Sequence, residues 1–135
     1  DIPKYATQGS AGMDIQAAID KHIIVKPGER ILIPTGFKVE IPENFEIQVR
    51  PRSGLAIKHG ISVLNSPGTI DSDYRGEIGV ILINHGDIDF KINPFDRIAQ
   101  IVVTQIIKVN IIKNDDLSKT QRGSGGFGST GENND

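Results

Sequence analysis

Short apolar runs rich in β-branched residues alternate with turn residues from about residue 20 to residue 112. The runs occupy residues 23–25, 31–33, 47–49, 61–64, 78–83 and 98–103. Such residues favour strands, and the Pro, Gly, Asn and Asp between the runs supply the backbone angles that turns require. Turns at this short spacing predict an all-β domain, built as a sandwich, a barrel or a jelly roll.

Two features modify this pattern. Residues 52–58 could form a short helix, whose length Gly54 and Gly60 limit. The run EIGVILIN (77–84) alternates little, so we expect both faces of that strand to be covered. In a chain of 135 residues, a neighbouring subunit is the expected second cover.

The last 22 residues, 114–135, differ sharply from the rest of the chain. Only Leu117 and Phe127 are large and apolar there, and RGSGGFGSTG (122–131) holds five glycines. The sequence therefore predicts one β domain, residues 1–113, and a mobile C-terminal arm, residues 114–135. The arm is either a disordered tail or a flap in which Arg122 and Phe127 close over a charged, ring-bearing ligand.

Composition excludes several classes of function. Seventeen acidic and 15 basic residues lack the excess positive charge of a non-specific nucleic-acid binder. The absence of cysteine rules out disulfides, thiolate nucleophiles and zinc–thiolate sites. No apolar run approaches the roughly 18 residues of a membrane span, and no signal-peptide pattern opens the chain. We expect a soluble cytoplasmic protein; because residue 1 is not Met, an organellar targeting segment is left open.

Two segments in the first half of the domain combine polar residues with glycine turns. SAGMD (10–14) reads as a turn that ends in a capping acid, or as a site where Asp14 orients water around a phosphate-bound cation. RPRSGLAIKHGI (50–61) reads as a solvated basic turn or as a phosphate cradle. The cradle would comprise the Arg52 guanidinium, the Ser53 hydroxyl and the amides of a helix start, without Walker-loop spacing.

The stretch LNSPGTIDSDYRGEIGVILIN (64–84) gathers amide, acid and aromatic side chains between two apolar runs. One interpretation is a hairpin with acidic turn residues. In the other, backbone groups and the Asn65 amide read a base edge, and Tyr74 offers a flat face to a sugar or base. In this second interpretation Asp71, which lies between an isoleucine and a serine, is the acid placed to take a proton from water, and Asp73 is a solvated turn residue.

Arg97 and Gln100 interrupt a strand in FDRIAQI (95–101), so one face of that strand is expected to look into a polar site. The three histidines lack a metal-ligand spacing such as HExxH. Ser53 and His59 alone make no nucleophilic triad, so a covalent mechanism is disfavoured.

These segments, with the glycine-rich arm, resemble the trimeric dUTPase family in kind and in order. The family elements AGxD, PRSGLA, GxIDxxYxGE, RIAQ and RGxxGFGSTG stand at residues 11–14, 51–56, 68–77, 97–100 and 122–131. The resemblance spans nearly the whole chain, and Ile15 and Gly79 are small departures that remove no functional group. It implies a homotrimer of jelly-roll subunits, which are distorted β-barrels, with each active site built from all three chains.

The resemblance implies a dUTP diphosphatase in which Asp71 activates the water that attacks the α-phosphorus, giving dUMP and pyrophosphate. The residues that it implies for uracil and deoxyribose are Asn65, Gly68, Thr69, Ile70, Asp71, Tyr74 and Gly79. The residues that it implies for the phosphates are Arg52, Ser53, Gly54, Gln100 and Arg122, with Phe127 and Gly128 in the flap over uracil. Mg²⁺ would be held by the phosphates and water, with Asp14 in the outer sphere.

Two other functions compete with this interpretation. A dCTP deaminase would need a second acid near the base, and Glu77 is the only nearby candidate. A regulatory module that keeps the nucleotide pocket would be favoured by loss of Asp71, Arg122 or Phe127, and all three are present.

Overall fold

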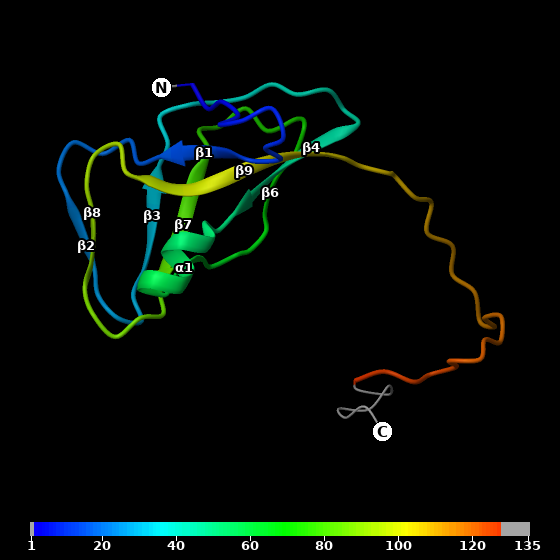
Figure 1. Ribbon diagram of the computed structural model, residues 1–135. Coiled ribbons are helices and arrows are strands. Elements are labelled where there is room, and N and C mark those ends of the chain that lie inside the picture. Colours follow the sequence, from blue (N-terminus) through cyan, green and yellow to red (C-terminus); the bar gives the residue numbers. More distant parts are fainter. Residues whose placement is uncertain (1, 128–135) are drawn as a thin grey trace.

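The computed structural model describes residues 2–127, in which nine strands and one short helix follow one another along the chain (Figure 1). The elements are β1 (Met13–Gln16), β2 (Ile23–Val25), β3 (Arg30–Pro34), β4 (Phe45–Arg50), α1 (Ser53–His59), β5 (Ile61–Val63), β6 (Gly68–Ile70), β7 (Gly79–Asn84), β8 (Phe90–Ile92) and β9 (Arg97–Gln105). The predicted all-β, jelly-roll-like domain is confirmed.

All six predicted apolar runs form strands, and the predicted short helix is α1. This helix ends at Gly60, whose φ of 67° is left-handed and therefore suits glycine. The pattern missed β1, β6 and β8, which are three or four residues long and lie outside the apolar runs. Within residues 2–127, no helix has the length and apolarity that a membrane crossing requires.

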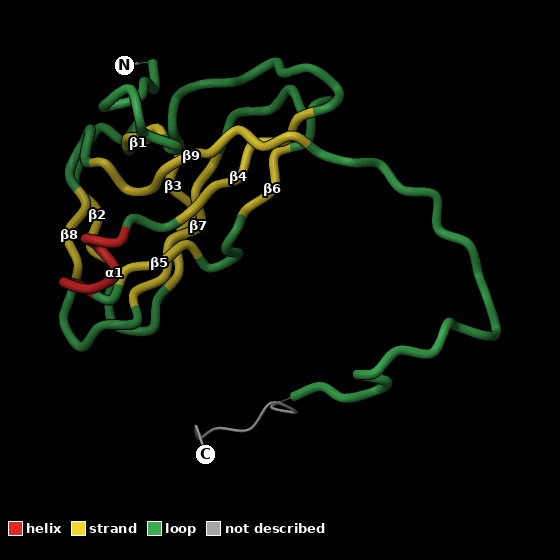
Figure 2. Tube along the Cα trace, turned by 45° about the vertical axis from the view of Figure 1, so that its right-hand side comes forward, coloured by secondary structure: helices red, strands yellow, loops and turns green. Residues whose placement is uncertain are grey.

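The strand pairings among residues 2–127 are all antiparallel. The strands, drawn in yellow in Figure 2, form three sheets. Their orders are β1-β9-β4-β6, β3-β7-β5 and β2-β8. Strand β9 is central, because it pairs with β1 on one side and with β4 on the other. The sheets enclose an aliphatic core, which includes Ile15 from β1, Ile33 from β3 and Ile92 from β8.

Strand β7 alternates more than its sequence indicated. Val80 and Leu82 are buried, whereas Ile81 and Ile83 on the other face are half-buried. The strand ends at Asn84, a fully buried polar residue whose amide nitrogen donates to the carbonyls of Val25 and Ile88 at 2.9 and 2.8 Å. Its amide oxygen accepts from the backbone of Gly86, so Asn84 ties β2 to the β7–β8 connection.

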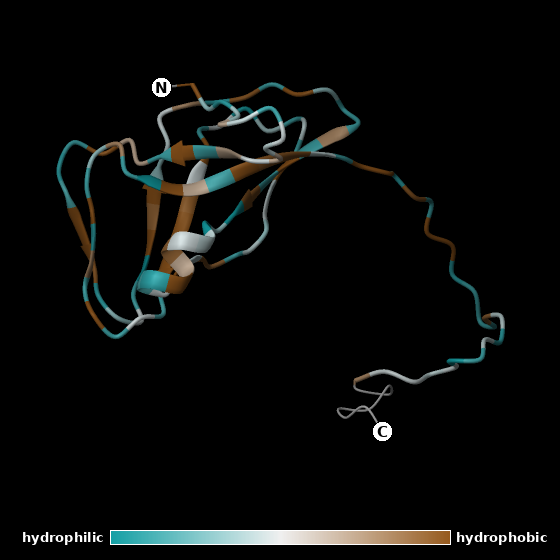
Figure 3. Ribbon diagram, in the orientation of Figure 1, coloured by the Kyte–Doolittle hydropathy of each residue, from teal (hydrophilic) through white to brown (hydrophobic). Residues whose placement is uncertain are grey.

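The chain leaves the domain after β9. Ile106 donates to the Asn44 carbonyl at 2.8 Å, and residues 106–127 then form no helix or strand. Figure 1 shows this segment extending away from the sheets, and Figure 3 shows that apolar residues continue into its first part. Ile107, Val109 and Ile111 are all more than 70% exposed there. The boundary at residue 113 stays a prediction.

Candidate active site

Four of the five predicted phosphate-binding residues, all except Arg122, meet where β1, β9 and α1 come together. Asp14 of β1 lies opposite Gln100 of β9, which in turn lies opposite Arg50 of β4. Arg52 is the N-cap of α1, and Ser53 and Gly54 begin the helix. The reading of Asp14 as a turn cap was wrong, because the turn precedes β1 and Asp14 itself is a strand residue.

Arg52 is held in a defined orientation. Its Nε lies 3.1 Å from Asp14 Oδ1, and its Nη1 donates to the Arg97 carbonyl at 2.9 Å. The Arg97 guanidinium approaches the other oxygen of Asp14 at 3.5 Å. Both carboxylate oxygens of Asp14 therefore face arginines, and the arrangement presents fixed positive charge. The sequence indicated Arg97 as a polar interruption of its strand but gave it no site role.

Gln100 is fixed by its neighbours. Its amide nitrogen donates to the Pro51 carbonyl at 2.9 Å, and a Cβ on Gly12 would overlap its amide oxygen. Gly12 therefore makes room for Gln100. A hollow of about 610 Å³ adjoins it, lined by Gln48, Arg50, Pro51, Ser53, Ala56, Ser66, Pro67 and Gln100.

The predicted base-reading segment is the edge strand β6. It pairs with β4 only, so in the described part of the chain the backbone groups on its other side face no strand. A Cβ on Gly68 would come within 3.2 Å of Val49 Cβ and 3.3 Å of the Asn65 amide nitrogen, so glycine suits this position. The hairpin predicted within residues 64–84 differs in the structure: β7 pairs with β5, which precedes this stretch, and the connection between them contains β6, which pairs with β4 in the other sheet.

Gly79, the last predicted sugar- or base-binding residue, begins β7 opposite Pro34. A Cβ built there would lie 2.7 Å from Leu32 Cδ1. The absence of a side chain at Gly79 thus makes room for the Leu32 side chain of the neighbouring strand β3.

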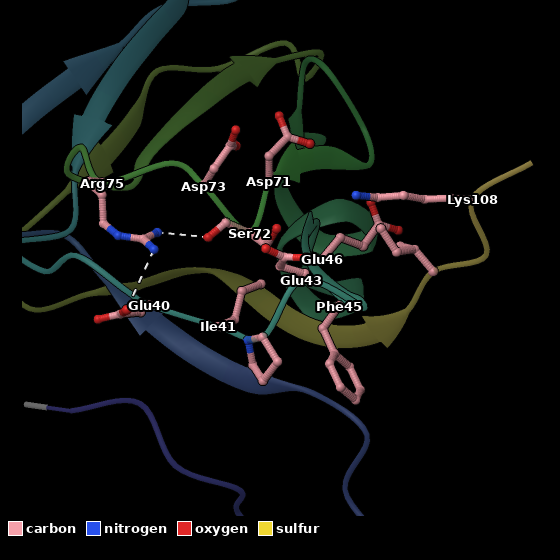
Figure 4. A pocket seen from close by; sticks show the side chains of 12 residues that line it. Glu40, Ile41, Glu43, Phe45, Glu46, Asp71, Ser72, Asp73, Arg75 and Lys108 are labelled. Atoms are coloured by element: carbon pink, nitrogen blue, oxygen red, sulfur yellow. Dashed lines mark hydrogen bonds and ion pairs between the residues drawn. The ribbon is translucent and has the colours of Figure 1, made fainter.

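Asp71 is exposed and lines a hollow of about 680 Å³ (Figure 4). The hollow is predominantly acidic, since Glu40, Glu43, Glu46 and Asp73 also line it, against Arg75 and Lys108. Arg75 is 3.6 Å from Glu40, and the carboxylates of Asp71 and Asp73 extend away from that ion pair. Within residues 2–127, no hydrogen bond or ion pair engages the Asp71 carboxylate, which leaves it able to accept a proton.

Tyr74 closes the turn that begins at Asp71, since its amide donates to the Asp71 carbonyl at 3.2 Å. Its hydroxyl donates to the Glu77 carbonyl at 3.0 Å, and the residue is 43% exposed. The aromatic ring is therefore fixed at its far end and still presents surface to a ligand.

Within residues 2–127, one copy of the chain does not bring Asp71 to the residues predicted to bind the phosphates beside α1. Ile70 lies opposite Ile47, so Asp71 is level with Glu46 at the start of β4. Arg52 lies six residues further along, beyond the other end of β4. At about 3.3 Å per residue, this places the two side chains roughly 15–20 Å apart along the sheet.

The predicted arm residues also lie apart from these groups. The Arg122 guanidinium donates to the Gly125 carbonyl within the arm at 2.8 Å, and Phe127 is fully exposed. Gly128 lies outside the described residues.

Comparison with known proteins decides the family. The model of the dUTPase family matches residues 1–131. The chain belongs to the dUTPase family. Deoxyuridine 5'-triphosphate nucleotidohydrolases from Chlamydia pneumoniae and Treponema denticola are each 61% identical to it, over 97% and 96% of this chain and 91% and 90% of their own lengths.

Solved dUTPase structures share the fold. The dUTPase of Staphylococcus bacteriophage 80alpha, solved with dUPNHPP, superposes with a TM-score of 0.88 at 25% identity. The alignment covers 97% of this chain and 92% of the phage chain. In the present chain, the Glu77 carboxylate accepts a hydrogen bond from the Gly36 amide at 2.8 Å. The second acid that a dCTP deaminase would require is therefore engaged in a structural contact.

Proposed function

We propose that this protein is a dUTP diphosphatase, which hydrolyses dUTP to dUMP and pyrophosphate. Such an activity limits uracil incorporation into DNA and supplies dUMP for dTMP synthesis. The observation that carries the proposal is the family match across residues 1–131, supported by relatives at 61% identity that bear this activity in their name. The 80alpha enzyme, solved with dUPNHPP, supports a nucleotide of this class as substrate.

The base and sugar are assigned to the segment around β6. The open backbone edge at Thr69 and Ile70, with the Asn65 amide and Gly68, offers donors and acceptors to the uracil edge. A cytosine there would leave buried groups unpaired, which would disfavour the cytosine nucleotide by up to ~10⁴-fold relative to the uracil nucleotide. Thymine has the same hydrogen-bonding edge and must be excluded by the volume of its methyl group.

The phosphates are assigned to Arg52, Ser53, Gly54 and Gln100, with Arg122 from the arm at the γ-phosphate. Phosphoryl transfer depends mainly on positioning and on stabilising charge, and Arg52 is already oriented by Asp14 and the Arg97 carbonyl. Phe127 and Gly128 would cover the uracil ring when the arm closes.

Asp71 is assigned as the general base. It takes a proton from water as the water oxygen bonds to the α-phosphorus. The bond between that phosphorus and the oxygen bridging to the β-phosphorus breaks, and its electron pair leaves with pyrophosphate. The in-line geometry requires the water and the leaving pyrophosphate to lie on opposite sides of the α-phosphorus.

The residues fit Mg²⁺ held with the substrate better than Mg²⁺ held in a protein cage. No group of three His, Cys, Asp or Glu residues within 2–127 is arranged to bind a metal. Both oxygens of Asp14 already face arginines, so this carboxylate suits an outer-sphere contact through water. Bound Mg²⁺ would neutralise charge that develops on the phosphates.

We also propose that the enzyme is a homotrimer with shared active sites. Within one copy, Asp71 and Arg52 lie roughly 15–20 Å apart along β4, so both side chains cannot contact the α-phosphate of one bound nucleotide. A neighbouring copy that supplies Asp71 and β6 to the Arg52 of the first copy would complete the site. The exposed apolar residues Ile107, Val109 and Ile111 favour such contacts between copies.

The test compares pyrophosphate release from dUTP, dTTP, dCTP and UTP with Mg²⁺ present. We expect rapid release from dUTP and slow release from the other three. Ammonia formed from dCTP would instead identify a deaminase. Nucleotide binding without pyrophosphate release would identify a regulatory module.

A further inference from the structure

The Tyr74 ring rests against Gly76. A Cβ on Gly76 would overlap the hydroxyl oxygen and Cζ of Tyr74 and lie 2.8 Å from its Cε2. The φ of Gly76 is not in the left-handed region, so its backbone accepts alanine without strain. Contact with the ring, and not the backbone conformation, is therefore what requires glycine at this position.

Glu77 joins the same ring to the body of the domain. Its carbonyl accepts the Tyr74 hydroxyl at 3.0 Å, and its carboxylate Oε1 accepts the Gly36 amide at 2.8 Å. The neighbouring Ile78 is buried, accepts from the Thr35 hydroxyl at 2.6 Å and donates to the Phe37 carbonyl at 3.1 Å. Residues 77–78 are thereby fastened to the loop 35–37, next to the β3–β7 ladder.

These contacts determine where the ring lies on an otherwise exposed turn. Residues 71, 73, 74 and 75 are all exposed, and the ring is constrained by Gly76 beneath it and by the Glu77 carbonyl at its hydroxyl. A flat surface excludes an additional hydroxyl from a bound sugar only if the ring cannot move aside. The contacts supply that resistance.

We propose that Gly76 and Glu77 are positioning residues that fix the plane of the Tyr74 ring and thereby set the preference for deoxyribonucleotides over ribonucleotides. The proposal rests on the proposed function, and on Tyr74 contacting the deoxyribose, as the resemblance to the dUTPase family implies. Gly76, which has no side chain, lets the Tyr74 ring lie close to the backbone at residue 76. Glu77 binds the Tyr74 hydroxyl through its backbone carbonyl, and the contact of the Glu77 carboxylate with the Gly36 amide holds that carbonyl in place.

The principal variant is Gly76→Ala, assayed with dUTP and with UTP. The alanine methyl displaces the ring, so the ratio of kcat/KM for dUTP to kcat/KM for UTP should fall on the order of tenfold. The matched control is Gly9→Ala, because no atom lies within 4 Å of a Cβ at Gly9 and its φ is not left-handed. An unchanged ratio in Gly76→Ala would overturn the proposal.

Glu77 gives a second, graded test. Glu77→Ala removes the acceptor for the Gly36 amide and should lower the dUTP-to-UTP ratio, whereas Glu77→Gln keeps an amide oxygen there and should restore most of it. Equal ratios in the alanine and glutamine variants would remove Glu77 from the positioning role.

A double-mutant cycle separates ring displacement from a general structural effect. In a Tyr74→Ala background the methyl at position 76 has no ring to strike, so adding Gly76→Ala should leave the dUTP-to-UTP ratio unchanged. A further fall by the same factor as in the wild-type background would show that Gly76 acts through the backbone, and the proposal would be wrong.

Tyrosine ring resonances give a readout that is independent of turnover. The chain has two tyrosines, and Tyr5→Phe assigns the signals. Gly76→Ala should shift the Tyr74 ring resonances and leave those of Tyr5 in place; unshifted Tyr74 signals would contradict the proposal. A wild-type enzyme without dUTP turnover would refute the proposed function, whereas normal wild-type turnover with an unchanged Gly76→Ala ratio would refute only the positioning role.

Discussion

At the scale of single residues, the two acids of the loop after β6 differ in their assigned roles more than in their surroundings. Asp71 and Asp73 are both exposed and both line the acidic hollow. Asp71 directly follows the edge strand, whereas Asp73 lies further along the turn. Its closeness to the base-reading edge is what favours Asp71 as the residue that contacts the attacking water.

Asp71→Asn should retain dUTP binding and lose turnover by a factor on the order of 10²–10⁴, because an amide cannot accept the proton. The measurement is kcat for pyrophosphate release beside the Kd of a non-hydrolysable dUTP analogue. Asp73→Asn is the matched control and should keep most of its turnover. Comparable rates for wild type and Asp71→Asn would remove Asp71 from its assigned role.

Residue types predicted the candidate site better than they predicted its contacts. The sequence identified Asp14, Arg52 and Gln100 as polar residues of one site, and the structure brings these three together. It did not reveal the structural contacts of Gly76 and Glu77. Glu77 binds Tyr74 through a backbone carbonyl, which every residue has, so no side-chain pattern encodes this contact.

At the scale of elements, the strands that carry an apolar run were predicted, including β2 and β5 with only three residues each, whereas β1, β6 and β8, which carry no such run, were missed. Strand β7 carries a continuous apolar run, but β6 consists of Gly68, Thr69 and Ile70, which show no recognisable alternation. Its identity as a strand comes from pairing with β4, a contact across some 20 residues of chain. Sequence alone therefore could not place Asp71 and Arg52 at opposite ends of one sheet.

Asn84 provides a stability prediction for the junction of β2 and β7. Asn84→Ala leaves the carbonyls of Val25 and Ile88 without their donor, which should lower the free energy of unfolding by about 2–3 kcal/mol. Urea unfolding measures the change. Asn110→Ala, at an exposed position after β9, should unfold at the wild-type midpoint. A similar midpoint for Asn84→Ala would show that water satisfies these carbonyls.

At the scale of the whole molecule, the described chain divides the proposed chemistry among three places. Arg52, Ser53, Gly54 and Gln100, which are assigned to the phosphates, lie at or beside the start of α1; Asp71 lies near the start of β4, and Arg122 and Phe127 lie on the arm. A single copy contains the groups assigned to the reaction, but within residues 2–127 it does not bring them together. Catalysis should therefore depend on association, and activity per chain should fall as the protein is diluted below the concentration at which the copies dissociate.

Truncation after Lys119 tests the contribution of the arm. It removes Arg122 and Phe127, so kcat/KM for dUTP should fall on the order of a hundredfold, while melting temperature and oligomeric state stay the same. Sedimentation and thermal unfolding check the last two quantities. Truncation after Gly131 retains the whole family match and is the matched control. Dissociation or unfolding of the Lys119 truncation would show that the arm is part of the structural core.

The open edge of β6 has a consequence for solubility. A strand that leaves its N–H and C=O groups unpaired to bind a base also offers them to any foreign strand, which is how edge-to-edge aggregation begins. Here the edge is only three residues long. Pro67, which has no N–H to donate, precedes it, and the charged Asp71 follows it. The exposed backbone is long enough to recognise one nucleobase and too short to nucleate a cross-β ladder.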